Sequence, residues 1–238
     1  MISKKWFSMR VLVVAVVLVF VSISFGQKAK PAKIPPGVPV KAGTEAKSIL
    51  DEGTIVGRTY RNETFGFEVT FPVYWTIAGD DFEAEAKRLG FDLSLKAPTS
   101  LKPVEKNQLD RALKRVNIFL TAYRTATKGI PENAIIRISV EDLNSQPQIK
   151  DAVDYFDAVR TMYQAIKLPP DFRYSETQAE KLGTKQFGYL GTSSDVGMKR
   201  MYATVKGRYA VMFTLSYRNN HDLETFRNIL ATGNFNLK

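Results

Sequence analysis

Residues 202–217 decide the fold, with the sequence Tyr-Ala-Thr-Val-Lys-Gly-Arg-Tyr-Ala-Val-Met-Phe-Thr-Leu-Ser-Tyr. Two runs of strand-forming residues flank Lys206-Gly207-Arg208, and this arrangement predicts a hairpin. In the second run an apolar or aromatic side chain recurs at every other position: Tyr209, Val211, Phe213, Leu215 and Tyr217. A period of two predicts a strand that turns one face to the core. We therefore expect an antiparallel sheet that contains this hairpin.

Further strands are predicted by the same kind of alternation. The expected ranges are Phe67 to Phe71, Phe91 to Leu95, Val116 to Tyr123, Ile136 to Glu141, about 174 to 182, about 186 to 193, and a short last strand from Asn234 to Leu237. In the third of these, Val116, Ile118, Leu120 and Ala122 are expected to share one face. Short turns between consecutive strands favour antiparallel pairing.

Helical spacing predicts four helices. Two short ones are expected at Asp81 to Arg88 and at residues 104 to 114. The longest should carry Ile149, Val153, Phe156, Met162 and Ile166 on one face and end before Pro169-Pro170. The last should begin at Asn219 or Asn220, bury Leu223, Phe226 and Leu230, and stop at Gly233. The predicted fold class is α+β, an antiparallel sheet sandwiched by helices.

The N-terminus has the pattern of an export signal. Lys4, Lys5 and Arg10 precede the apolar run Val11 to Phe25, and small residues stand before Gln27. We therefore expect residues 1–26 to be a signal peptide and the chain to be exported, as a periplasmic or secreted protein. The alternative is an uncleaved anchor in the inner membrane, although the run is shorter than the roughly 20 residues that span a bilayer.

Residues 27–47 are expected to form a basic, Pro-rich, disordered linker, and residues 48–238 a single domain. Of the net charge of +10, the signal holds +3 and the linker +4, so the domain carries only +3. This distribution, together with export, excludes nucleic acid as a partner. The lysines make weak contact of the linker with anionic lipid an alternative to a plain spacer. Without cysteine the domain has no disulfide and no lipid-bearing thiol.

No motif for catalysis is found. The chain has one histidine, His221, and Gly191-Thr192-Ser193-Ser194-Asp195 lacks the closing glycine of a nucleophile elbow. His221-Asp222 is interpreted as a helix start, where an acidic side chain complements the helix dipole. The sequence has no His-Glu-x-x-His, no Walker loop and no Gly-x-Gly-x-x-Gly. We therefore assign no catalytic, cofactor-binding or metal-binding residue and expect a protein that is not an enzyme.

Two acidic groups and one sequon were weighed as sites. Their residues are Asp80, Asp81, Glu83 and Glu85 in one segment, Asp151, Asp154 and Asp157 along the longest helix, and Asn62-Glu63-Thr64. Close carboxylates can bind calcium or perform acid–base chemistry, but neither group has the spacing of a calcium loop. An ordinary solvated face is favoured for the helix acids. A tight turn is sufficient to explain the sequon.

Two stretches resemble PsbP-like domains. The first is Tyr60-Arg61-Asn62, followed by Phe65 to Pro72 and Trp75; the second runs from Tyr209 to Leu215 and closes, after a helix, on Asn234-Phe235. The resemblance covers about residues 54–238 and implies an α/β/α sandwich that acts as a binding or assembly module. It implies no histidine metal site here, and no photosystem role is supported. By themselves, Gly66, Pro72 and Trp75 are interpreted as a turn, a strand end and a core edge.

The sequence therefore predicts an exported, non-catalytic binding or accessory module of the cell envelope. Its partner is expected to be an envelope protein. The alternatives are an envelope hydrolase that uses carboxylates and a membrane-surface protein that uses the lysine-rich arm.

Overall fold

The computed structural model describes residues 50–78, 103–124, 134–165, 168–195 and 197–237. The expected signal segment, linker, helix at Asp81 to Arg88 and strand at Phe91 to Leu95 lie outside these residues.

An antiparallel sheet of eight strands forms the centre of the domain, in the order β4-β5-β6-β11-β10-β9-β7, with β8 paired to β9. The strands are β4 (Trp75–Ile77), β5 (Val116–Arg124), β6 (Ile135–Asp142), β7 (Arg173–Tyr174), β8 (Gln178–Leu182), β9 (Lys185–Ser194), β10 (Gly197–Lys206) and β11 (Tyr209–Tyr217). A small antiparallel sheet contains β1 (Thr54–Val56), β2 (Thr59–Asn62) and β3 (Phe67–Thr70). The described helices are α2 (Pro103–Leu113), α3 (Ala152–Ala165) and α4 (Asn220–Thr232).

The expected hairpin is confirmed as β10–β11, whose register pairs Lys206 with Tyr209. Gly207 has φ +60° and is the first of the two turn residues between these strands. This is the position at which a type II′ turn requires glycine. β11 therefore lies in the middle of the sheet, between β10 and β6.

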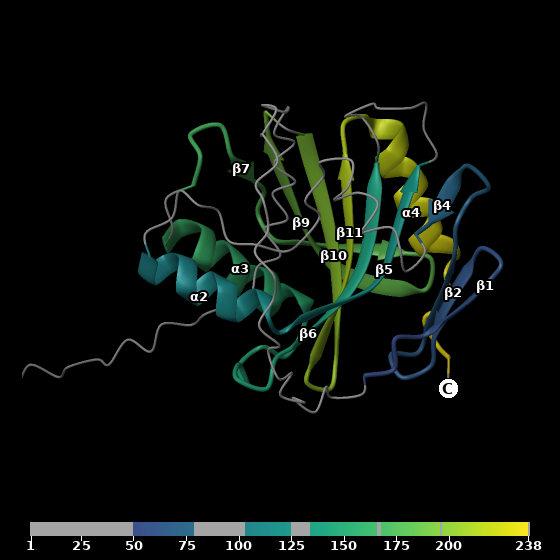
Figure 1. Cartoon of the computed structure of the whole chain (residues 1–238), viewed down its shortest axis with the longest axis horizontal. Coiled ribbons are helices and arrows are strands. Elements are labelled where there is room, and N and C mark those ends of the chain that lie inside the picture. Colours follow the sequence, from purple (N-terminus) through teal and green to yellow (C-terminus); the bar gives the residue numbers. More distant parts are fainter. Residues whose placement is uncertain (1–49, 79–102, 125–133, 166–167, 196, 238) are drawn as a thin grey trace, which may run out of the picture.

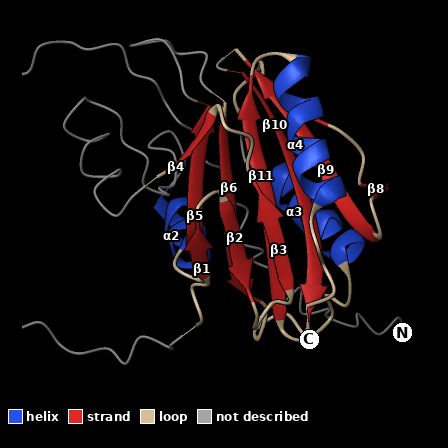
Figure 2. Ribbon diagram, turned by 90° about the vertical axis from the view of Figure 1, so that its right-hand side faces the viewer, coloured by secondary structure: helices blue, strands red, loops and turns tan. Residues whose placement is uncertain are grey.

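β11 is buried on both faces, from residue 210 to residue 215. Val211, Phe213 and Leu215 belong to a core that includes α4 and the small sheet, which we call the α4 core. Ala210 and Met212 point the other way, into the α3 core with the buried residues of α3. One face of the large sheet is thus covered by α3, and the other by α4 together with β1–β3 (Figure 2). The antiparallel α+β class is confirmed.

The two faces differ in side-chain size. On the α3 face small residues let the helix approach closely: a Cβ on Gly188 would lie 2.8 Å from the Cβ of Ala152. On the α4 face Phe213 packs edge-to-face on Phe67 and Phe187, with ring centroids 5.1 and 6.0 Å apart. Large rings therefore fill the space to the small sheet and α4, where the edge-to-face geometry is favourable.

The expected single apolar face of β5 is wrong. The register on β6 shifts between Ile118 and Leu120, as at a β-bulge. Because one extra residue is accommodated there, Leu120 and Ala122 face the α4 core whereas Val116 packs against the α3 core. The sequence does not reveal this bulge, because apolar residues continue to recur at every second position through it.

Helix α3 is the longest described helix, as predicted, but its buried face is rotated from the expected one. Val153 is 40% exposed, and Ile149 is buried ahead of the helix. The buried residues are Ala152, Tyr155, Phe156, Ala158, Val159 and Tyr163. Alanines and tyrosines form much of the face, so a search for aliphatic residues alone misplaces it. Ile166 lies outside the described residues.

Near the C-terminus, α4 begins and ends as expected, with Asn219 as N-cap and Gly233 as C-cap. The expected strand Asn234 to Leu237 is instead one bridge, between Asn234 and Glu68 on β3. The segment is held by backbone hydrogen bonds of Asn234 with Glu68 and of Leu237 with Gly66, and by the ring of Phe235, which stacks on Phe67. The expected strand over about 174 to 182 is likewise divided, into β7 and β8.

Trp75 provides a test of this packing. It is 1% exposed in the α4 core, so Trp75→Ala should lower the free energy of unfolding by about 3–5 kcal/mol. Val73→Ala, in the same turn and 82% exposed, should change it by less than about 0.5 kcal/mol. Urea denaturation of both variants measures the difference; equal stabilities would contradict the burial of Trp75.

Candidate functional site

The acids of α3 serve the helix itself. Asp151 Oδ1 accepts hydrogen bonds from the backbone N–H groups of Val153 and Asp154, and Asp154 Oδ2 accepts one from Lys150. These contacts cap the helix N-terminus. Asp157 accepts a hydrogen bond from the Thr177 hydroxyl at 2.6 Å. The three carboxylates do not converge, and within the described residues no cluster of metal-ligating side chains is found. Asp80, Asp81, Glu83 and Glu85 lie outside the described residues.

The His221-Asp222 pair is a helix start, as predicted. His221 is exposed, whereas Asp222 is buried and reciprocally hydrogen-bonded with the N-cap Asn219. Asp222 Oδ1 also pairs with Arg124 at 3.0 Å. Sequence analysis missed this ion pair, which joins the end of β5 to the N-terminus of α4 and brings together residues almost 100 positions apart.

The sequon asparagine is structural. Asn62 is 0% exposed, its Oδ1 accepts from the Phe65 N–H at 2.8 Å, and its Nδ2 donates to the Asp51 carbonyl at 2.9 Å. In the folded chain both polar atoms of this side-chain amide are hydrogen-bonded, and its Oδ1 holds the turn that precedes β3. The predicted turn is sufficient to explain the motif.

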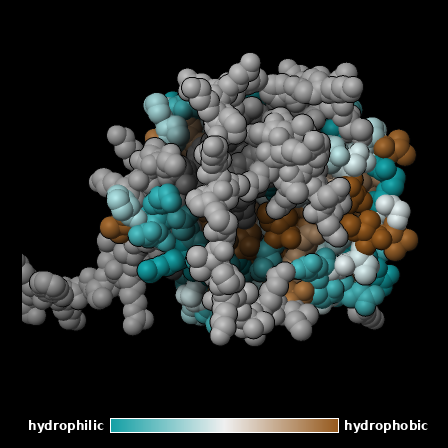
Figure 3. Space-filling view, viewed as in Figure 1, coloured by the Kyte–Doolittle hydropathy of each residue, from teal (hydrophilic) through white to brown (hydrophobic). Residues whose placement is uncertain are grey.

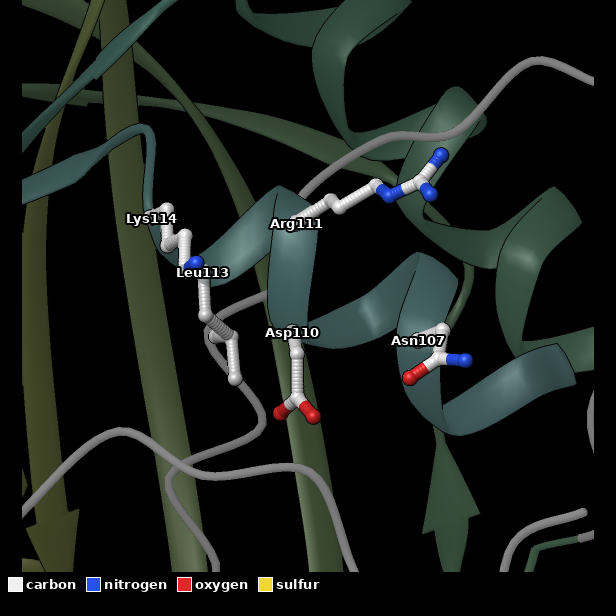
Figure 4. Close-up of a pocket in the computed structure, with 5 residues that line it drawn as sticks. All are labelled: Asn107, Asp110, Arg111, Leu113 and Lys114. Atoms are coloured by element: carbon white, nitrogen blue, oxygen red, sulfur yellow. The ribbon is translucent and has the colours of Figure 1, made fainter. Parts of the chain in front are cut away.

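A hollow of about 530 Å³ lies beside α2 (Figure 4). Its described lining residues all come from this one helix or the residue after it: Asn107, Asp110, Arg111, Leu113 and Lys114. Figure 4 shows the side chains of Asp110, Arg111 and Lys114 pointing in different directions. A binding site needs polar groups that converge on a ligand. The described groups here do not converge.

A buried carboxylate joins β6 to α3. Glu141 is 0% exposed, accepts a hydrogen bond from the Tyr155 hydroxyl at 2.8 Å and lies 3.4 Å from the Arg115 guanidinium. Burial and the charge of Glu141 raise the pKa of Tyr155 well above its ordinary value. The tyrosine therefore stays protonated and donates to the carboxylate. This arrangement positions α3 on the sheet.

Two cations share the α3 face at the other end of the strands. Arg137 lies between Ile136 and Ile138, which face the α4 core, so its side chain is on the opposite, α3 face. Lys199 is two residues before Met201, which belongs to the α3 core, so it lies on that same face. Burial lowers the pKa of Lys199 to about 7, and the charge of Arg137 acts in the same direction. Among the described groups whose pKa is shifted, Lys199 has the pKa closest to neutral pH.

The most interaction-prone surface is a tyrosine–arginine cluster on the α4 side of the sheet. We define it by Tyr189, Arg200, Tyr202, Glu180 and Arg227, from strands β8 to β10 and helix α4. The Arg200 guanidinium carbon lies 4.4 Å from the ring centre of Tyr189 and 5.9 Å from that of Tyr202. A guanidinium over aromatic rings gains a cation–π attraction. Both Tyr189 and Arg200 remain partly exposed.

The cluster is held in place by polar contacts. The Tyr202 hydroxyl donates to Glu180 at 2.6 Å, and Arg227 pairs with the other oxygen of that carboxylate. The Tyr189 hydroxyl donates to Gln178. Burial, followed by the hydrogen bond to Glu180, raises the pKa of Tyr202 above its ordinary value. The two rings are therefore held by hydrogen bonds, and the Arg200 guanidinium lies over them.

Sequence analysis did not find this cluster. Its members come from separate elements and follow no motif. Tyr189 and Tyr202 are cross-strand partners in the β9–β10 register, and only that register brings them together. No signal in the sequence marks these residues as neighbours.

No family model and no curated protein matches the sequence. Among solved structures, the chain is similar to cyanobacterial PsbP from Synechocystis, with 11% identity, a TM-score of 0.39, and coverage of 83% of this chain and 96% of that one. It is similar to a Bacteroides thetaiotaomicron protein, with 11% identity, a TM-score of 0.35, and coverage of 75% and 48%.

A third similar structure is LpqN of Mycobacterium tuberculosis, described as involved in cell envelope biogenesis, with 12% identity, a TM-score of 0.37, and coverage of 71% of this chain and 82% of that one.

The depressed pKa of Lys199 predicts how stability depends on pH. Between pH 7 and its ordinary pKa of 10.5, the unfolded chain binds a proton at Lys199 that the folded chain has released. The free energy of unfolding contributed by this group therefore rises with pH across that window. Lys199→Met should abolish this rise, measured by urea unfolding from pH 7 to pH 10. Lys181→Met, on an exposed position of β8, should retain it; an unaltered slope in Lys199→Met would contradict the assignment.

Proposed function

We propose that the protein is an exported, non-catalytic binding module of the cell envelope, and that an envelope protein docks on the tyrosine–arginine cluster. One observation carries the proposal: the Arg200 guanidinium lies over the rings of Tyr189 and Tyr202, both rings are held by hydrogen bonds, and Arg200 is partly open to solvent. Tyrosine and arginine are the residues that contribute most at protein interfaces. Fixing them beforehand lowers the entropy cost of binding.

The chemistry of the cluster favours binding over catalysis. Tyr202 has a raised pKa and keeps its proton, and the Glu180 carboxylate is occupied by Arg227 and by the Tyr202 hydroxyl. General acid–base catalysis needs a group whose pKa lies near the working pH and whose proton is available to a substrate. None of these contacts supplies one.

The sequence supports the location. The basic apolar pattern of residues 1–26 directs export, and residues 27–47 supply a basic, Pro-rich segment ahead of the domain. In this proposal the domain works in the periplasm or outside the cell. The lysines of residues 27–47 give that segment an affinity for anionic lipid.

Substitution of Arg200 tests the proposal. In the native cells, crosslinking of the tagged protein followed by mass spectrometry should capture an envelope protein, and Arg200→Ala should reduce its capture about tenfold or more, as expected for an interface hot spot. Arg208→Ala is the matched control, because Arg208 also lies over a tyrosine, with 5.0 Å to the Tyr209 ring centre. That variant should capture the partner normally.

Melting temperatures of both variants establish that they fold. Equal capture by Arg200→Ala and the unsubstituted chain would contradict the proposal. A turnover of envelope material that is lost on substitution of Asp80 to Glu85 would contradict the non-catalytic part.

A further inference from the structure

Exposed apolar side chains gather at one end of the small sheet. Six large hydrophobic residues are exposed in the described part of the chain, and four of them lie on β1 or on the turn between β3 and β4. These four, Ile55, Val56, Val73 and Tyr74, are called the turn surface. Figure 3 shows hydrophobic side chains at the right-hand edge, where Figure 1 places β1 and β4.

The turn surface is fixed by one arginine. Arg58, in the turn after β1, donates through Nε to the Phe71 carbonyl at 3.0 Å and through Nη2 to the carbonyls of Pro72 and Trp75. Beside it the hydroxyls of Thr59 and Thr70 are 2.8 Å apart. The two turns are therefore joined, and the apolar residues they carry keep a fixed relation to each other.

The surface has the chemistry of a membrane-interface contact. Val73 is 82% and Val56 77% exposed, and both occupy turn ends that no strand of the described chain covers. Tyr74 combines an exposed ring with a hydroxyl 3.4 Å from that of Thr225. Tyrosine, apolar at one end and polar at the other, is enriched at the headgroup level of bilayers.

The hollow beside the turn surface has no carboxylate in its described lining. The hollow between Tyr74 and α4 is lined by neutral residues: Thr70, Pro72, Tyr74, Thr225, Asn228, Ile229 and Thr232. The one charged side chain that joins the two turns is the cation Arg58. A neutral-to-basic apolar edge suits a phospholipid surface.

The position of the turn surface in the chain indicates that its partner is a membrane. The 49 residues ahead of the described structure contain the apolar run Val11 to Phe25 and then five lysines between residues 27 and 47. They lead through Leu50 directly into β1, so the first folded element after the export segment and the basic arm carries half of the turn surface. Membrane association is stable when two weak signals act together.

We propose that the turn surface inserts into the headgroup–acyl boundary of a phospholipid bilayer and, together with the basic arm, orients the domain on the membrane. Val56 and Val73 are the inserted side chains, and Tyr74 lies at headgroup level. This inference does not depend on the tyrosine–arginine cluster and adds a lipid contact to the proposed protein contact.

The absence of cysteine allows a direct test. Val73→Cys is labelled with an environment-sensitive fluorophore in protein purified from the exporting cells and bound to vesicles of phosphatidylcholine and phosphatidylglycerol. Val104→Cys on α2 is the matched control, because Val104 is 68% exposed and lies on the side of the molecule away from β1. The label at residue 73 should shift to shorter wavelength and be quenched by doxyl-labelled lipid, whereas the label at residue 104 should do neither.

A further substitution makes the test independent of the label. Adding Val56→Ser to the Val73→Cys chain should reduce the quenching, because it removes one of the two inserted side chains. A label at residue 73 that is as solvent-exposed as that at residue 104 would overturn the proposal. A shift to shorter wavelength without lipid quenching would overturn it in favour of contact between copies of the chain.

Discussion

The burial of β11 on both faces is the constraint on which the structure depends. A strand with apolar side chains on both faces must be covered twice. On the α3 side Ala210 and Met212, with Gly188 opposite the helix, are small enough or flexible enough for α3 to pack closely. On the α4 side Phe213 and its neighbours project further, and α4 is joined there by the small sheet. The two cores share β11, so neither can be lost without exposing one face of it.

The two candidate contact surfaces lie beside α4 and at the end of the small sheet. The Arg200 guanidinium lies over tyrosines of β9 and β10 beside α4, and Arg58 joins the turn after β1 to the turn after β3. α4 contacts both β3 and β8, so it lies between the two regions. In our account the domain is a stiff support that presents a lipid contact on one side of α4 and a protein contact on the other.

The sequence predicted what local periodicity controls. It identified the β10–β11 hairpin, a cap at Asn219 or Asn220, and the antiparallel class, because each follows from short-range patterns in the sequence. It missed what only register creates: the bulge between Ile118 and Leu120, the ion pair of Arg124 with Asp222, and the pairing of Tyr189 with Tyr202. The tyrosine–arginine cluster could not be predicted, since its residues come from four elements and meet only in the folded domain.

Hydrogen exchange along the chain, measured by mass spectrometry without ligand, tests the central claim most directly. If β11 unites the two cores, amides of β6, β10 and β11 should exchange together and slowest, at the free energy of global unfolding, while those of β1 exchange much faster through local opening. The amides of α3 and α4 in the segments that face β11 should exchange with similar free energies of opening. Exchange of the α3 side at a distinctly lower free energy than the α4 side would contradict a single cooperative unit built on this strand.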